Sequence, residues 1–323
     1  MDALPIQEDA DHDYRSTVPG VMHACGHDAH MAGLLGAAHL LAGARTDGSL
    51  PPGRVRLLFQ PSEEGMDEEG KSGATRMVED GAMEGVAAVA GLHVGAHLPA
   101  GKVFVSEGAI MAGSDDLRVV VRGRSAHAAL PHEGIDALVL AAQGILGSQQ
   151  AVSRRLSPME NGVVTFGQVL GGVASNVVPE EITLKGTVRY FTEEVRTRLH
   201  AGVVGAFMGL EAQGANVDVE VFRGYPPLVN DRAVTAISRQ VAMEVVPEAD
   251  VWDAEPMMGA EDFAILAREA PGVFLWLGAA LPDPREHHNP RFDIDESVLP
   301  IASALLAGTA TRLLRELSAE GAP

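Results

Sequence analysis

The chain has 323 residues, 46% of them hydrophobic and 21% charged, so it can bury a large core and is expected to form two structural units. Its formal net charge of −20 excludes the basic surface that binding to nucleic acids or anionic membranes requires. Neither a signal peptide nor an unbroken apolar run of membrane-spanning length, roughly 20 residues, is recognisable, which predicts a cytoplasmic protein.

Apolar segments typical of strands alternate along the chain with longer segments whose apolar residues recur at helical spacing. The predicted strands span residues 55–59, 86–93, 117–121, 163–169, 182–190, 217–222 and 273–277. The predicted helices span residues 31–41, 135–152, 195–210, 233–245 and 298–317. This alternation predicts an α/β fold with a mixed sheet.

The middle of the chain has the order strand, helix, strand, strand, helix, strand, which is typical of a ferredoxin-like domain. Residues 113–116 and 224–227 resemble hinges, since they contain glycine, proline and small polar residues. We therefore predict an inserted α+β domain at residues 113–225 and a discontinuous α/β domain made of residues 1–112 and 226–323. No predicted helix or strand precedes the motif at residues 22–30. The discontinuous α/β domain is therefore expected to lack an N-terminal portion.

The densest group of candidate metal ligands lies at residues 22–30, Met-His-Ala-Cys-Gly-His-Asp-Ala-His, directly before an apolar helix. Its thiol, carboxylate and three imidazoles suit a soft or borderline divalent ion. Cys25 and His27 are two residues apart, so their side chains can reach one point from an extended segment or a tight turn. The other two histidines remain open candidates, and Asp28 could instead cap the helix. Cys25 alone could also be a nucleophile or a buried small hydrophobe.

A second motif, Leu-Leu-Phe-Gln-Pro-Ser-Glu-Glu-Gly at residues 57–65, ends an apolar segment with two adjacent carboxylates. Functional groups of open α/β sheets gather outside the carboxyl ends of their strands, which favours a site over a solvated turn. Neighbouring glutamates point in different directions in extended chain. Glu63 and Glu64 could therefore divide the work, one binding metal and the other acting as general base.

Two further segments carry histidines. His93 ends the apolar run at residues 86–93, and His287 and His288 lie in a loop before the last predicted helix. Each alone could be a structural or surface residue. Together with the earlier motifs they supply one thiolate, one carboxylate and three imidazoles, enough to hold two metal ions and a bridging water. No nucleophile elbow, phosphate-binding loop or aromatic and basic nucleic-acid surface competes with them.

These motifs resemble the M20 metallopeptidase family, in particular subfamily D, which includes hippurate hydrolases, N-acyl-amino-acid amidohydrolases and auxin-conjugate hydrolases. No single motif is specific, but the combination is, and it spans nearly the whole chain. The similar segments are residues 2–6, 22–30, 60–65, 91–94, 125–132, 171–179, 259–263 and 288–292. Family members carry a helix and strands ahead of the first of these, so the resemblance also implies a missing N-terminal segment.

The resemblance implies a site with two divalent metal ions, and the donor set admits zinc, manganese, cobalt or nickel. It implies that the metal ligands are Cys25, His27, Glu64, His93 and His288. The thiolate of Cys25 would be able to bridge the two ions. Glu63 would be the general base.

The resemblance also implies roles for three residues of the inserted domain, which would serve as a lid and dimerisation domain. His127 would reach across a homodimer interface to stabilise the tetrahedral intermediate. Asn176 and Arg189 would bind the carboxylate end of the substrate. The planar fork of an arginine suits that role because it can pair with a carboxylate through two hydrogen bonds.

The expected reaction is hydrolysis of the amide bond of an N-acyl amino acid or a related small amide by a metal-bridged water, with Glu63 moving the proton to the leaving amine. Two alternatives stay open. A metal-free thiol hydrolase would use Cys25 as nucleophile and His27 as base, which leaves Glu63, Glu64 and His288 without roles. A non-catalytic or truncated metal-binding dimeric homologue would bind two ions and hydrolyse no N-acyl amino acid.

Overall fold

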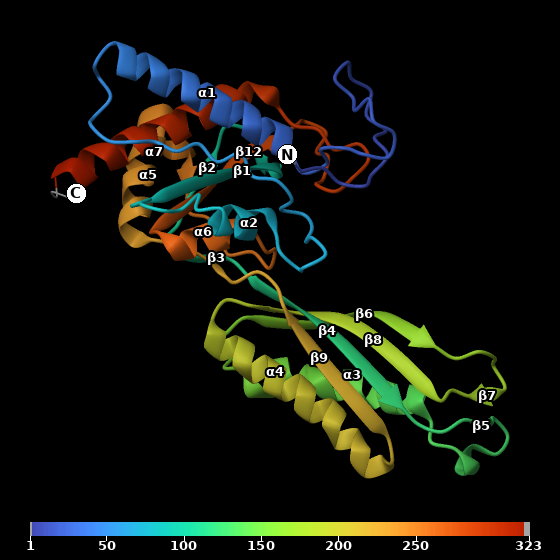
Figure 1. Ribbon diagram of the computed structural model, residues 1–323. Helices are drawn as coiled ribbons and strands as arrows, with labels where there is room; N and C mark the ends of the chain where they lie inside the picture. The colour runs from blue at the N-terminus through green and yellow to red at the C-terminus, as the bar shows by residue number, and fades with distance from the viewer. Residues whose placement is uncertain (1, 320–323) are drawn as a thin grey trace. The chain divides into compact units, whose positions relative to one another are not determined.

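The computed structural model of the protein describes residues 2–319, which divide into two compact units (Figure 1). Unit 1 comprises residues 2–110, 229–256 and 262–319, and unit 2 comprises residues 111–228 and 257–261. The main segment of unit 2 contains the whole insertion predicted from the sequence. Residues 257–261 differ from that expectation and lie in unit 2, because the backbone N–H of Ala112 bonds to the carbonyls of Met257 and Gly259.

Unit 1 is built on a mixed four-stranded sheet of order β1-β12-β2-β11. β1 (Val89–Pro99) and β12 (Gly272–Ala280) run parallel, with Val89 opposite Gly272. β2 (Val103–Phe104) is antiparallel to β12 and parallel to β11 (Val251–Trp252). Almost all of β12 is buried, which explains its unbroken apolar sequence, as is usual for a strand covered on both faces.

Five helices belong to unit 1. They are α1 (His27–Thr46), α2 (Gly73–Glu79), α5 (Arg232–Val245), α6 (Phe263–Glu269) and α7 (Leu299–Ala319). Figure 1 shows α1 and α7 side by side on one side of the sheet and α2 and α6 on the other. The close approach of α1 to α7 requires a glycine, because a Cβ at Gly36 would lie 2.1 Å from the Ser303 hydroxyl oxygen.

A helical segment, Glu296–Ser318, is long and apolar enough to cross a membrane, with a mean hydropathy of 1.4 in its most apolar window. This composition has another explanation, because α7 packs against both α1 and α5. Ala302 and Leu305 on its inner face are fully buried in the core of unit 1. Core helices of globular proteins commonly pass the same test, so the segment is weak evidence for a span.

Unit 2 contains an antiparallel sheet of order β6-β8-β4-β9 with α3 and α4 packed on one face (Figure 1). Its elements are β4 (Gly113–Arg122), α3 (Ala137–Arg155), β6 (Gly162–Gly171), β8 (Glu181–Tyr190), α4 (Glu193–Met208) and β9 (Asn216–Arg223). The predicted order of strands and helices is confirmed, as is the α/β fold class. The core under the helices includes Val119, Leu184 and Phe207, each with no exposed surface.

Short elements complete the two units. β5 (Ala126–His127) pairs with β7 (Val177–Val178), and β3 (Gly108–Met111) pairs with β10 (Leu228–Asn230). Single 3₁₀ turns lie at Pro131–Glu133, Gly209–Gln213, Glu248–Asp250 and Glu296–Val298. The strand predicted at residues 55–59 is wrong, because this extended segment has no strand partner in the described chain.

Candidate metal centre

A sharp turn before α1 presents Cys25 and His27. Gly26 adopts the left-handed conformation, with φ of 83°, and a Cβ there would lie 2.7 Å from a methyl group of Val94. Only glycine tolerates both conditions without strain. Since α1 begins at His27, the turn separates the two side chains by one residue and leaves both beside His93 in the interior of β1.

The thiol of Cys25 belongs to two groups of possible metal ligands. Its sulfur lies 3.5 Å from Nε2 of His93, and the ligand atoms of Cys25, His27 and His93 all lie within 4.8 Å of one another. The same limit holds for a second group, Cys25, Glu64 and His288. The other four side chains that the sequence singled out as candidate ligands therefore lie around the buried sulfur atom of Cys25.

His288 and Glu64 lie close together, but one oxygen of the Glu64 carboxylate has no hydrogen bond within the described chain. Nε2 of His288 lies 2.9 Å from Oε1 of Glu64, yet this buried oxygen accepts no hydrogen bond within the described chain. His288 also has a positive φ of 60°, which is uncommon for a residue with a side chain and is a kind of backbone strain that clusters at functional sites. An orphaned buried oxygen beside an imidazole is the arrangement that a cation would complete.

Glu63 lies beside this group and faces His27. Its Oε2 is 3.9 Å from Nε2 of His27, and the ligand atoms of His27, Glu63 and Glu64 lie within 4.8 Å of one another. The two adjacent carboxylates therefore reach the same small region from one loop. Next to them, Asp2 accepts a hydrogen bond of 2.6 Å from the backbone N–H of Glu64.

Hydrogen bonds to the backbone of β1 distinguish the candidate ligand His93 from two other histidines, His30 and His287. Nδ1 of His93 lies 2.7 Å from the carbonyl oxygen of Val94; if it donates there, Nε2 is left with a lone pair that faces Cys25. Nε2 of His30 instead accepts from the Val94 N–H, and Nε2 of His287 accepts from the Ala96 N–H. These last two rings therefore support β1, and no ligand group among the described residues includes them.

The buried imidazoles of this region are neutral at physiological pH. Burial lowers the pKa of His93 to about 3 and that of His287 to about 4, against an ordinary value of 6.5. Burial also lowers the pKa of His30 well below that value, and nearby histidines act in the same direction. A neutral imidazole is the form that binds a metal ion.

These shifts predict a loss of stability in mild acid for protein stripped of metal. Below pH 6.5 the unfolded chain binds protons at His93 and His287 that the folded chain does not bind, so the free energy of unfolding falls as the pH falls. We expect a loss of roughly 1–3 kcal/mol per pH unit from the pair below pH 6. Urea unfolding at pH 7.0, 6.0 and 5.5, above the range in which most carboxylates titrate, measures it. A constant free energy over this range would contradict the prediction.

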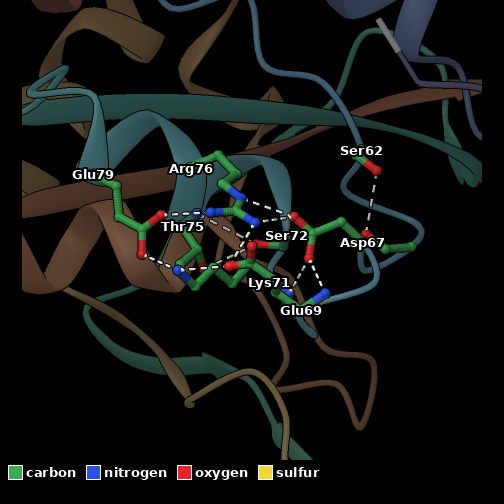
Figure 2. Close-up of polar contacts among 9 residues, drawn as sticks. Ser62, Asp67, Glu69, Lys71, Ser72, Thr75, Arg76 and Glu79 are labelled. Carbon is green, nitrogen blue, oxygen red and sulfur yellow. Dashed lines mark hydrogen bonds and ion pairs between the residues drawn. The ribbon is translucent and has the colours of Figure 1, made fainter.

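The loop that carries Glu63 and Glu64 is fastened to α2 by surface ion pairs (Figure 2). Arg76 contacts Asp67 at 2.6 Å, Glu69 at 3.0 Å and Glu79 at 3.0 Å. Lys71 contacts Glu79 at 2.6 Å and Glu69 at 3.3 Å. All five side chains are at least 32% exposed, and exposed pairs contribute little because water screens them.

Unit 2 carries the three other residues that the resemblance indicated. His127 and Asn176 lie side by side, because the Ala128 N–H bonds to the Asn176 carbonyl where β5 meets β7. Nδ1 of the exposed His127 accepts from the Ala129 N–H, so a proton on a neutral ring resides on Nε2. Arg189 is not near this pair within the unit. It lies at the other end of β8, opposite Ser114, roughly 23 Å along the strand from Ile182 at the β7 end.

Comparisons with known proteins agree with the motifs. A model of peptidase family M20/M25/M40 matches residues 1–312. The chain is 39% identical over 315 residues to N-acetyl-L-cysteine deacetylase of Bacillus subtilis (strain 168), covering 97% of this chain and 73% of that protein. It is 37% identical over 329 residues to IAA-amino acid hydrolase ILR1-like 2 of Arabidopsis thaliana, covering 99% of this chain and 72% of that protein.

A solved structure extends the comparison to the fold. The chain is similar to the YXEP protein of Bacillus subtilis, which is described as a dinuclear metal binding peptidase from the M20 family. The TM-score is 0.82 at 33% identity, over 97% of this chain and 80% of that one. The family match and these relatives show that this chain belongs to peptidase family M20/M25/M40 and is an amide-hydrolysing enzyme.

Proposed function

We propose that this enzyme hydrolyses the amide bond of N-acyl amino acids or related small amides with the help of two divalent metal ions. The ions would be held by Cys25, His27, Glu64, His93 and His288. The observation that carries the proposal is the membership of Cys25 in both ligand groups, because a thiolate shared by two groups can bridge two ions. The relatives that deacetylate N-acetyl-L-cysteine or hydrolyse IAA-amino acids support this class of substrate.

The residues present suit a pair of borderline divalent cations. A thiolate, neutral imidazoles and a carboxylate are ligands that zinc, manganese, cobalt or nickel accept. The orphaned Oε1 of Glu64 gives an independent reason to expect a cation, since buried carboxylate oxygens are otherwise hydrogen-bonded. The likeness to a protein described as dinuclear supports the number of ions.

In the proposed reaction Glu63 acts as the general base and later as the general acid. When bound, the two ions would acidify a water between them and polarise the scissile carbonyl. The carboxylate of Glu63 would take the proton of the attacking water and then give it to the nitrogen of the leaving amine. Its position beside His27 and Glu64, on the same loop as a proposed ligand, supports this role.

We further propose that unit 2 acts as the lid and dimerisation domain. His127 would donate from Nε2 to the oxygen that gains charge in the tetrahedral intermediate, and Asn176 and Arg189 would bind the carboxylate of the substrate. Within one chain Arg189 lies far from the other two residues along β8, so different subunits of a homodimer would have to contribute them to one site.

An exposed sheet edge supports the homodimer. β6 ends the order of the unit 2 sheet and has no strand partner on its outer side in the described chain. Val169 and Leu170 on this strand are 52% and 46% exposed, and Val173 just beyond it is 90% exposed. Exposed apolar edge strands tend to pair with a second chain.

Subunit mixing is expected to restore activity if His127 acts across the dimer. His127→Ala and Glu63→Gln each inactivate both sites of a homodimer, whereas a mixed dimer combines one intact Glu63 with the partner's intact histidine. Coexpression should recover about a quarter of wild-type activity at random pairing. Glu63→Gln coexpressed with His288→Ala is the matched control, because these two residues share one site and no recovery is expected. Equal activities of the two mixtures would place His127 in its own subunit's site.

The proposed function is tested by elemental analysis of the purified protein together with a deacylation screen. We expect two divalent ions per chain, hydrolysis of at least one member of an N-acyl amino acid panel, and loss of activity on chelation that added metal reverses. Activity that survives chelation but is abolished by thiol alkylation would instead support a Cys25 nucleophile. Two bound ions with no hydrolysis of the panel would contradict the proposed substrate class.

A further inference from the structure

Asp262 is a fully buried carboxylate to which the proposed reaction assigns no role. It stands at the N-terminal cap of α6, yet its side chain makes no capping hydrogen bond to that helix. One oxygen instead accepts from Nε2 of Gln60 at 2.5 Å, and the other accepts from the backbone N–H of Ala74 at 3.0 Å. A carboxylate without exposed surface is costly unless it is hydrogen-bonded, so both contacts matter for this fold.

Gln60 and Ala74 stand at the two ends of the loop that carries Glu63 and Glu64. Gln60 precedes this loop, and Ala74 follows it as the second residue of α2. The base of the loop is closed by a hydrogen bond of 2.9 Å from the Gly73 N–H to the Ser62 carbonyl. A Cβ at Gly73 would lie 1.5 Å from the Pro61 carbonyl oxygen, so the two ends meet with no room for a side chain.

The buried contacts of Asp262 and the surface pairs of Arg76 hold the same loop in different surroundings. Arg76 and its partner Asp67 are each 38% exposed, whereas Asp262 is 0% exposed. Hydrogen bonds to a buried charge are stronger than exposed ion pairs, and losing one leaves a buried donor without a partner. Asp262 should therefore determine the position of the loop more than Arg76 does.

We propose that Asp262 is a positioning residue whose hydrogen bonds to Gln60 and Ala74 hold the Glu63–Glu64 loop in the geometry that binds metal. The inference rests on the proposed function, since Glu64 is a ligand only there. Groups that orient a metal ligand from behind commonly set metal affinity, and their loss costs about 10–100-fold. The ion held by Glu64 is the one that should depend on Asp262.

Two substitutions distinguish positioning from a role of the negative charge. Asp262→Ala removes both acceptors. It should lower the affinity for one of the two zinc ions by about 10–100-fold, while the affinity for the other changes little. Asp262→Asn should stay within about threefold of wild type, because its oxygen can still accept from Ala74 and its amide can donate to Gln60 once the Gln60 amide turns over. Arg76→Ala, on the same loop, is the matched control and should change zinc affinity by about twofold at most.

The measurement is zinc titration of the metal-free proteins in competition with a chromogenic chelator, with circular dichroism and thermal unfolding to check the fold. If Asp262→Ala does not fold, Gln60→Met tests the same contact, because methionine is similar in size to glutamine but lacks the amide donor. This variant should lower the affinity for the same zinc ion several-fold. Unchanged affinity for both ions in these variants would overturn the proposal. An asparagine variant as weak as the alanine variant would also overturn it, because charge would then be the cause. Wild-type protein that binds no zinc would instead contradict the proposed function.

Discussion

Replacing Glu63 by glutamine is expected to lower kcat for amide hydrolysis by about 10²–10⁴-fold while both metal ions stay bound. Glutamine has nearly the same shape but cannot take a proton from water at neutral pH. The Glu63 carboxylate lies 3.9 Å from His27, and its ligand atom lies within 4.8 Å of that of Glu64. It is therefore close enough to take a proton from a water held near these two proposed ligands. The loss should appear in kcat, with a smaller change in KM.

The neighbouring glutamate supplies the control for this experiment. Glu64→Gln should reduce metal content, because it alters a proposed ligand, whereas Glu63→Gln should not. Metal content by elemental analysis and steady-state kinetics on the same preparations separate the two effects. Full turnover by Glu63→Gln with both ions bound would show that another group is the base.

Replacing Cys25 by alanine is expected to remove both ions at micromolar zinc, a larger loss than any single histidine change produces. The reason is that Cys25 joins the group with His27 and His93 to the group with Glu64 and His288, whereas His288 belongs to the second of these groups only. His288→Ala should therefore leave one ion in place, held by Cys25, His27 and His93. Calorimetric titration of each metal-free variant with zinc gives the number of ions and their affinities.

The same variant decides between a bridging thiolate and a thiol nucleophile. A Cys25→Ala protein that still binds two ions, but has lost turnover, would support the nucleophile. Its neighbour His30 is the matched control for disturbance of the turn, because Nε2 of His30 bonds to the backbone of β1 and no ligand group contains it. A conservative His30→Gln variant should keep both ions.

Within each motif the sequence indicated which ligand candidates lie close together, because these residues are near neighbours in the chain. Cys25 and His27 flank a single glycine, Glu63 and Glu64 are adjacent, and His93 lies within a buried strand. The residue pattern alone left both His287 and His288 open, and only the family resemblance indicated His288, since the choice depends on the Ala96 N–H that binds His287 from far away in the chain. The metal-binding roles themselves remain proposals.

The residues that support the site were beyond prediction for the same physical reason. Asp262 and Gln60 are 202 residues apart, and nothing in either motif shows that their side chains meet. The segment at residues 55–59 had the composition of a strand, but pairing needs a neighbouring strand with free hydrogen-bonding groups, and the described chain offers none there. In unit 2 the succession of strand-like and helix-like segments was sufficient to predict the order of elements, because that unit is nearly continuous in the sequence.

The pairing of β1 with β12 has a consequence for how the chain acquires its structure. Val89 lies opposite Gly272, and all of unit 2 lies between these two residues in the sequence. During synthesis β1 therefore cannot pair with β12 until the ribosome has translated the whole inserted unit and β12 itself. Unit 2 can form its own local contacts in that interval, and late closure of non-local strands is slow and exposes apolar edges. Truncation after unit 2 should consequently leave β1 as an aggregation-prone segment, even though every residue up to that point is intact.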